Sequence, residues 1–160
     1  MISRIKIPEA RLGVLIGSGG VVKKRIEQEL GVRISIGEYV AIESEDALAV
    51  MSAENIVRAI GRGFAPEKAF KLLSEENVLE ILELPKSERE LKRVCSRLIG
   101  AKGKARANLE RLTGCDISVY GKTVSIIGPP EAVDKARQAI EMLIEGSSHR
   151  AVWTWLERRR

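Results

Sequence analysis

The stretch LIGSGGVVKKRIEQELGVRISI, residues 15–36, places three glycines within four residues, directly before a basic segment with helical spacing. Glycine has no Cβ atom, so another molecule can approach such a main chain closely. A Walker loop needs Gly-Lys-Ser/Thr five residues after a first glycine, but the only Gly-Lys-Thr, residues 121–123, has Asp116 at that place. A dinucleotide fingerprint starting at Gly17 would need Gly or Ala where Val22 stands. The loop therefore matches neither nucleotide-binding motif.

The loop occurs twice in the chain. Gly17 and Gly20 return as Gly100 and Gly103, a shift of 83 residues. In both copies another glycine follows 14 residues after the first loop glycine, and an alternating strand-like segment comes next, VRISI in one copy and CDISV in the other. Two matches in spacing and order indicate an internal duplication of one structural unit.

Periodicity predicts the same order of elements in each half. Residues 3–8 and 77–85 alternate like strands that end at a proline, and residues 45–61 and 130–145 have the length and end signals of a closing helix. Each half is predicted as strand, helix, glycine loop, helix, strand, strand, helix. The helix before the second loop should be longer, because 14 residues separate Pro85 from Gly100 and eight separate Pro8 from Gly17.

Composition limits the class of protein. The 160 residues carry a formal charge of +5, which favours anionic partners without proving one. No run of about 18 apolar residues or signal peptide is present, so a cytoplasmic protein is expected. Cys95 and Cys115 are expected to be reduced core residues, and His149 has no carboxylate or cysteine at ligand spacing. We expect no metal, no cofactor and no enzymatic activity.

Charge is distributed unevenly along the chain. Residues 86–106 contain eight Lys/Arg and two Glu, a net charge of +6, whereas residues 38–85 contain ten acidic and four basic side chains, a net charge of −6. The basic segment includes the second glycine loop and the helix predicted before it. We therefore expect the second unit to bind nucleic acid more strongly and the acidic segment to meet a protein partner.

The motif Ile-Gly-x-x-Gly between two helices, followed by a glycine and a strand pair, resembles the KH domain, and the resemblance occurs twice. The extra strand and helix at the C-terminal side mark the type I arrangement. The resemblance implies an α+β fold with two tandem type I KH domains (β-α-α-β-β-α), each a three-stranded antiparallel sheet packed on one side by three helices. The expected organisation is KH domain 1 at 1–62, a docked helical connector at 63–76, KH domain 2 at 77–146 and a basic aromatic tail at 147–160.

A narrower resemblance rests on the connector and the tail. RAIGRGFAPEKAFKLL (residues 58–73) and LIEGSSHRAVWTWLERRR (residues 143–160) are similar to the archaeal members of the Dim-two or partner-of-Nob-one family. This implies a single-stranded RNA-binding factor for ribosome assembly and rRNA processing that binds the 3′ region of small-subunit rRNA. It also implies, as protein partners, an rRNA endonuclease and the alpha subunit of translation initiation factor two.

The expected RNA contacts follow from the chemistry of a single strand, which has phosphates on one edge and unstacked bases on the other. The phosphate-side candidates are the loop residues and the basic side chains near them: Gly17, Ser18, Gly19, Gly20, Lys23, Lys24, Arg25, Arg97, Gly100, Ala101, Lys102, Gly103, Lys104 and Arg106. The apolar candidates for a groove that holds bases are Val14, Ile16, Val21, Ile34, Leu98, Ile99 and Ile117.

Two alternatives stay open. The same clamp would serve a KH subunit of an RNA-decay or regulatory complex, which differs in target and not in chemistry. In the tail, Trp153 and Trp155 are expected to stack on bases, or one tryptophan packs against the second domain while the terminal arginines fray.

Overall fold

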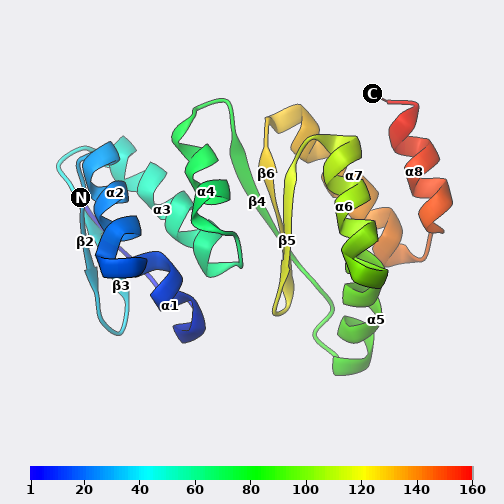
Figure 1. Ribbon diagram of the computed structural model, residues 1–160, viewed down its shortest axis with the longest axis horizontal. Helices are drawn as coiled ribbons and strands as arrows, with labels where there is room; N and C mark the ends of the chain where they lie inside the picture. Colours follow the sequence, from blue (N-terminus) through cyan, green and yellow to red (C-terminus); the bar gives the residue numbers. More distant parts are fainter. Residues whose placement is uncertain (160) are drawn as a thin grey trace. The chain divides into compact units, whose positions relative to one another are not determined.

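A computed structural model describes residues 1–159, and the chain divides into two compact units, Met1–Ser74 and Glu75–Arg160. The first unit contains these elements in chain order (Figure 1): β1 Ile2–Ile5, α1 Glu9–Ile16, a 3-10 turn Ser18–Gly20, α2 Val21–Leu30, β2 Arg33–Ile36, β3 Val40–Glu43, α3 Ala47–Gly61, α4 Pro66–Ala69 and a second 3-10 turn Phe70–Leu73. The helix predicted at 45–61 begins at Ala47 because the Asp46 side chain caps it, accepting hydrogen bonds from the N–H groups of Leu48 and Ala49.

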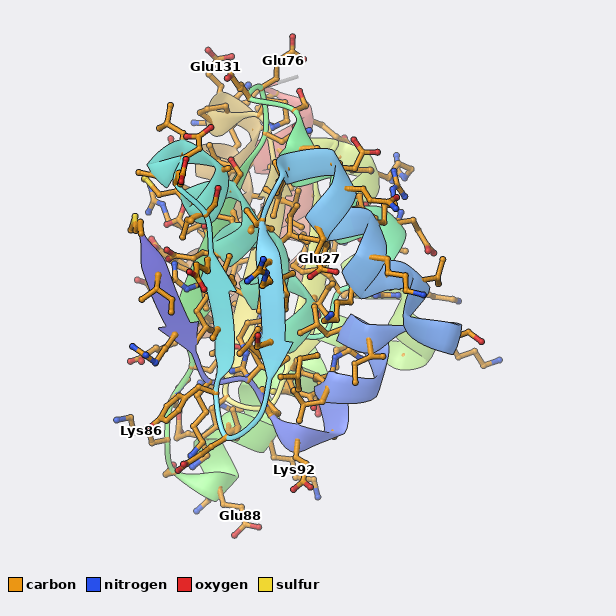
Figure 2. All side chains as sticks on the ribbon, turned by 90° about the vertical axis from the view of Figure 1, so that its left-hand side faces the viewer. Glu27, Glu76, Lys86, Glu88, Lys92 and Glu131 are labelled. Atoms are coloured by element: carbon orange, nitrogen blue, oxygen red, sulfur yellow. The ribbon has the colours of Figure 1, made fainter. Side chains whose placement is uncertain are left out.

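The first sheet is antiparallel with strand order β1-β3-β2. Ile34 lies opposite Ile42 and Ile5 opposite Val40, and these four side chains are buried. Because side chains alternate along a strand, the other face carries polar and charged residues, including Arg33 opposite Glu43. Figure 2 shows this sheet from its open side, with α1 and α2 lying next to β2. The apolar face is therefore the one that the helices cover.

The second unit repeats the arrangement (Figure 1). Its elements are β4 Val78–Glu83, α5 Glu88–Ile99, a 3-10 turn Ala101–Gly103, α6 Lys104–Thr113, β5 Asp116–Tyr120, β6 Thr123–Gly128, α7 Pro130–Glu145 and α8 His149–Glu157. The sheet is antiparallel with order β4-β6-β5, and its core joins Ile117, Val124 and Ile126 to apolar side chains of the helices. The expected α+β fold with two three-stranded antiparallel sheets is confirmed. As predicted, α5 is longer than α1, with 12 residues against eight.

The segment after α3 is part of the first unit. In the range predicted as connector, residues 63–76, Phe64, Phe70 and Leu72 are buried, and α4 and the turn after it pack on α3. Arg11 of α1 donates hydrogen bonds to the carbonyl oxygens of Ile60 at 2.7 Å and Phe64 at 2.8 Å. These bonds tie α1 to the last turn of α3 and to the segment that follows it.

The segment predicted as a tail forms a helix. Ser148 caps α8 by accepting a hydrogen bond from the N–H of Ala151 at 3.1 Å, and the helix packs against α6 and α7. Val152 and Leu156 are the buried anchors of α8, whereas Trp153 and Trp155 are only half-buried. Their four-residue spacing places the two anchors on one face of the helix. The second unit therefore has an additional helix that a type I KH core does not require.

A carboxylate secures the edge strand at the same place in both units. Glu27 of α2 accepts a hydrogen bond from the N–H of Ile34 at 2.9 Å, and Glu110 of α6 accepts one from the N–H of Ile117 at 3.0 Å. Both pairs are separated by seven residues and match in the 83-residue shift; Figure 2 shows Glu27 beside β2. Edge strands present unpaired N–H groups, so this bond ties the outer strand to the second helix.

Replacing Glu110 by Ala should lower the free energy of unfolding by about 1–3 kcal/mol, because the N–H of Ile117 loses its acceptor in a partly buried place. Glu110→Gln keeps an acceptor oxygen and should retain most of the stability. Urea unfolding of both variants measures the difference, and the Glu27 pair of variants repeats the test in the first unit. Equal stability of the Ala and Gln variants would show that the bond contributes nothing.

Candidate nucleic-acid interface

The first glycine of each loop is required by space. Gly17 has φ 76° and Gly100 has φ 73°, and both donate their N–H to the carbonyl oxygen four residues earlier, which ends the preceding helix. A Cβ atom at Gly17 would lie 2.5 Å from Cγ2 of Val22, and one at Gly100 would lie 2.8 Å from the main-chain nitrogen of Ala105. The next helix therefore starts in direct contact with the end of the previous one.

The last glycine of each loop starts the second helix. Gly20 and Gly103 adopt left-handed conformations, with φ 81° and 75°, at the N-cap positions of α2 and α6. No side chain caps either helix. The main-chain N–H groups at a helix start carry partial positive charge and attract anions by about 0.3–1 kcal/mol at exposed sites. The geometry suits one phosphate group at each loop.

The middle of the loop distinguishes the two units. Gly19 has φ 62°, and the matching Lys102 has φ 54°, which makes it the only residue other than glycine with positive φ in the described part of the chain. A left-handed conformation costs a residue with a Cβ atom roughly 1–2 kcal/mol relative to its right-handed form. The second loop thus has a lysine in a backbone conformation that glycine would adopt with less strain.

Basic side chains near the second loop are free to meet a ligand. Lys102, Lys104 and Arg106 are exposed and form no hydrogen bond or ion pair with any residue of the described range 1–159. In the first unit, Lys23 lies 3.5 Å from Glu27, and the Arg25 guanidinium lies 4.0 Å above the ring of Phe70. Lys24 is exposed, and its aliphatic end lies near Gly20. The unpaired positive charge is greater at the second loop.

The basic side chains of segment 86–106 lie along α5 as well as at the loop. Figure 2 labels Lys86 and Lys92 around the beginning of α5. A 12-residue helix is about 18 Å long, so the positive charges at its start are far from the loop at its end. Arg93 donates a hydrogen bond to the carbonyl oxygen of Ile144 at 3.3 Å. The positive charge of this segment is therefore divided between the length of α5 and the loop, as expected for a loop and the helix before it.

Arg97, predicted as an RNA contact, has its guanidinium engaged within the fold. It donates to the carbonyl oxygen of Leu143 at 2.9 Å and to that of Ser147, and so stabilises the end of α7 as Arg11 stabilises the end of α3. Its own carbonyl oxygen bonds His149 at 2.8 Å. The linear sequence gave no sign of this role, because its partners are 46 and more residues away.

The apolar candidates divide by burial. Ile34, Leu98 and Ile117 are core residues with exposed fractions of 2%, 1% and 2%, so they support the surface from below and cannot touch a base in this structure. Val21 and Ile99 are exposed at 59% and 37%. Val14 and Ile16 are half-buried. These last four side chains are the apolar surface next to the two loops.

The remaining side chains of interest are those of metal-binding types and two cysteine thiols. Among residues 1–159, no group of three His, Cys, Asp or Glu side chains is arranged to hold a metal ion, and none of the helices described is long and apolar enough to cross a membrane. Cys95 and Cys115 are free thiols, and burial raises the pKa of both. The protonated thiol is the weaker nucleophile, so neither cysteine is activated.

Replacing Lys102 by Gly should leave the free energy of unfolding unchanged or raise it by up to about 1 kcal/mol, because relief of the left-handed strain offsets the chain entropy of glycine. Affinity for single-stranded RNA should fall, with a salt slope lower by roughly 0.7. Lys102→Gln removes the charge and keeps the strain, so it should weaken binding without the gain in stability. Unchanged affinity in both variants, measured by fluorescence anisotropy, would exclude Lys102 from the interface.

Comparison with known proteins extends over the whole chain. Two family models match: "Eukaryotic type KH-domain (KH-domain type I)" at residues 75–160 and "KH domain" at residues 2–75. A KH domain-containing protein of Methanocaldococcus jannaschii is 48% identical over 165 residues, a match that covers 98% of this chain and 73% of that protein.

Solved structures agree with the sequence matches. The crystal structure of Dim2p from Pyrococcus horikoshii superposes with a TM-score of 0.92 at 47% identity and covers 99% of both chains. A crystal structure of an a/eIF2alpha–aDim2p–rRNA complex from the same organism matches with a TM-score of 0.91 at 45% identity, covering 99% of this chain and 93% of that one. The similarity of fold and the sequence identity, both extending over nearly the whole chain, confirm the resemblance inferred from the sequence. The chain belongs to the Dim2p, or partner-of-Nob-one, family of proteins with two KH domains.

Proposed function

We propose that the protein binds single-stranded RNA with its glycine loops and that the second unit binds more strongly. The observation that carries this is the second loop itself. Two left-handed positions open the main chain at Lys102 and Gly103, an uncapped helix starts there, and Lys102, Lys104 and Arg106 are unpaired within the described range. A phosphate finds main-chain donors and cations at one place.

The surface next to the loop suits a single strand better than a duplex. Ile99 presents apolar surface beside the clamp, and such surface can contact a base only if the base is unstacked. A duplex hides its base faces and offers only its backbone. Each phosphate neutralised in a single strand adds about 0.7 to the slope of log affinity against log salt, so binding should fall steeply as salt rises.

Replacing Ala101 and Lys102 together by Asp should weaken RNA binding by at least about 2 kcal/mol, because two negative charges then stand where the phosphate lies. The same change at Ser18 and Gly19 should weaken binding less, since no lysine is lost there. The Ser18/Gly19 double variant should have a lower melting temperature than the Ala101/Lys102 double variant, because Gly19 has φ 62° and aspartate is strained in that conformation.

Affinity and melting temperature must therefore be measured for both double variants. A larger loss of affinity in the Ser18/Gly19 variant, with both proteins folded, would reverse the ranking of the two units. No loss in either variant would show that the glycine loops are not the clamp.

The proposed target is the 3′ region of small-subunit rRNA, which makes the protein a ribosome assembly and rRNA-processing factor without catalytic activity. Membership of the Dim2p family supports this proposal, as does the rRNA in the complex of the Pyrococcus horikoshii relative. The alternative is an RNA-decay or regulatory complex that uses the same clamp. No feature of the loops separates the two targets, because a loop that holds phosphates reads no sequence.

A binding competition separates the targets. An oligonucleotide with the 3′-terminal sequence of the small-subunit rRNA should compete at least tenfold better than a scrambled strand of equal composition, a difference of about 1.4 kcal/mol. A duplex of the same sequence is the control and should compete poorly. Equal competition by the scrambled strand, together with crosslinks in cells to messenger RNA only, would favour the alternative.

Two protein partners are proposed with this function. The alpha subunit of translation initiation factor two is supported by the a/eIF2alpha in the relative's complex, and an rRNA endonuclease is supported by the family resemblance alone. We assign protein contacts to exposed acidic side chains of segment 38–85, which has a net charge of −6. Co-purification with each partner, repeated with Lys replacing exposed Glu45 and Glu75, tests that assignment.

A further inference from the structure

A small cavity lies beside the second loop. Its volume is about 200 Å³, and it is lined by Gly100, Ala101, Lys104, Asn108, His149 and Trp153. Drug-sized ligands occupy pockets of about 300–1,000 Å³, so this cavity suits one flat ring and not a whole free nucleotide. Half of its named lining belongs to the loop and the start of α6, where the phosphate clamp is proposed.

Trp153 is held in place by the contacts of α8. Val152 and Leu156 anchor the helix in the core of the second unit, and the ring of His149 lies 5.7 Å from the ring of Trp153. Nε2 of His149 is 2.8 Å from the carbonyl oxygen of Arg97, which can only accept, so Nε2 donates the hydrogen. This bond ties the first turn of α8 to the end of α5. The indole therefore stands beside the loop as a rigid, half-buried surface.

The corresponding position of the first unit is occupied by the planar side chain of an arginine. Arg25 and Asn108 are each the fifth residue of the second helix, and both lie near an aromatic side chain from the segment after the third helix. In the first unit the planar guanidinium of Arg25 covers the ring of Phe70 at 4.0 Å. In the second unit the shorter Asn108 lines the cavity together with Trp153. The second unit thus has no guanidinium at the position from which Arg25 covers Phe70 in the first unit.

We propose that a nucleobase of an RNA strand held by the second loop enters this cavity and stacks on Trp153. Asn108 accepts a hydrogen bond from Arg111 with its oxygen at 3.3 Å, and its amide nitrogen donates to no residue in the described range, so that nitrogen is available to the base edge. Lys104, in the same lining, neutralises the adjoining phosphate. The inference rests on the proposed RNA binding and adds a base site outside the groove.

The position of the cavity favours RNA over a protein side chain. It adjoins the loop through Gly100 and Ala101, so a strand whose phosphate lies at the loop brings its next base within reach. The flanking charge is positive, which matches a polyanion. Base stacking on an aromatic side chain depends little on sequence. A site of this kind would therefore increase the number of RNA nucleotides bound without adding sequence specificity.

Trp153→Leu tests the proposal, with Trp155→Leu as the matched control on the same helix. Trp155 is also half-buried, but the guanidinium of Arg159 already lies 4.1 Å above its ring and it lines a separate hollow with Met142 and Thr154. With an oligoadenylate of about ten nucleotides, Trp153→Leu should weaken binding about tenfold and Trp155→Leu less than about twofold. With a strand of about four nucleotides, enough for the loop alone, neither should matter.

A fluorescence titration checks the same point without removing Trp153. In a Trp155→Phe protein, Trp153 is the only indole, and its emission should be quenched as the longer oligoadenylate binds. Unchanged emission, or equal affinity of Trp153→Leu and unsubstituted protein for the longer strand, would overturn the proposal. If the Ala101/Lys102 double variant still loses RNA affinity in that case, the clamp stands and only the base site fails. Loss of initiation-factor binding alone in Trp153→Leu would assign the cavity to a protein and also overturn the proposal.

Discussion

Both units depend on a glycine whose Cβ position is already occupied by the next helix. At Gly17 the space is filled by Val22, and at Gly100 by Ala105. A residue with a side chain would clash with the next helix at this position. With glycine there, the two helices are joined by a turn of only three residues, and the main chain is exposed at that turn. The same constraint directs the start of the second helix toward solvent. The N–H groups at the start of the second helix are then available to an anion. The glycine that the helix packing requires thus also produces the proposed phosphate site.

The rest of each unit holds this helix pair against the sheet. Glu27 and Glu110 bond the edge strand to the second helix, while Arg11 and Arg97 bond the first helix to the end of the third. Each of these side chains bonds a backbone group at an edge strand or a helix end near the loop. The duplicated units differ mainly in what they add around the loop: the first covers its aromatic ring with Arg25, and the second adds Lys102 and α8.

The duplication made much of the fold predictable. Matching loops, matching glycines after the second helix and alternating strands located the order of elements and the two sheets, because they are local patterns with a fixed period. The charge of the site was less predictable. Arg97 lies in a basic run, yet its partners Leu143 and Ser147 are distant in sequence. Ile34, Leu98 and Ile117 are apolar like any base-contacting residue, and only the packed structure shows that they are buried.

The tail was the least predictable segment. Its aromatic and basic residues suggested either stacking on bases or packing. Both tryptophans pack, half-buried, against the core of the second unit, and Val152 and Leu156 are the fully buried anchors. A four-residue spacing of Val and Leu next to two tryptophans could have indicated an amphipathic helix. Nothing in the sequence places Trp153 beside Gly100 and Ala101, because that proximity arises from the packing of α8 on α6.

If the second glycine loop holds the phosphate of a single strand, amide chemical shifts will show the contact residue by residue. Titration of the labelled protein with single-stranded RNA should shift the N–H signals of residues 100–106 most, followed by those of the first loop. The open face of the first sheet, which carries Arg33 and Glu43, should change little. Largest shifts on that sheet face, with the signals of residues 100–106 unchanged, would contradict the account.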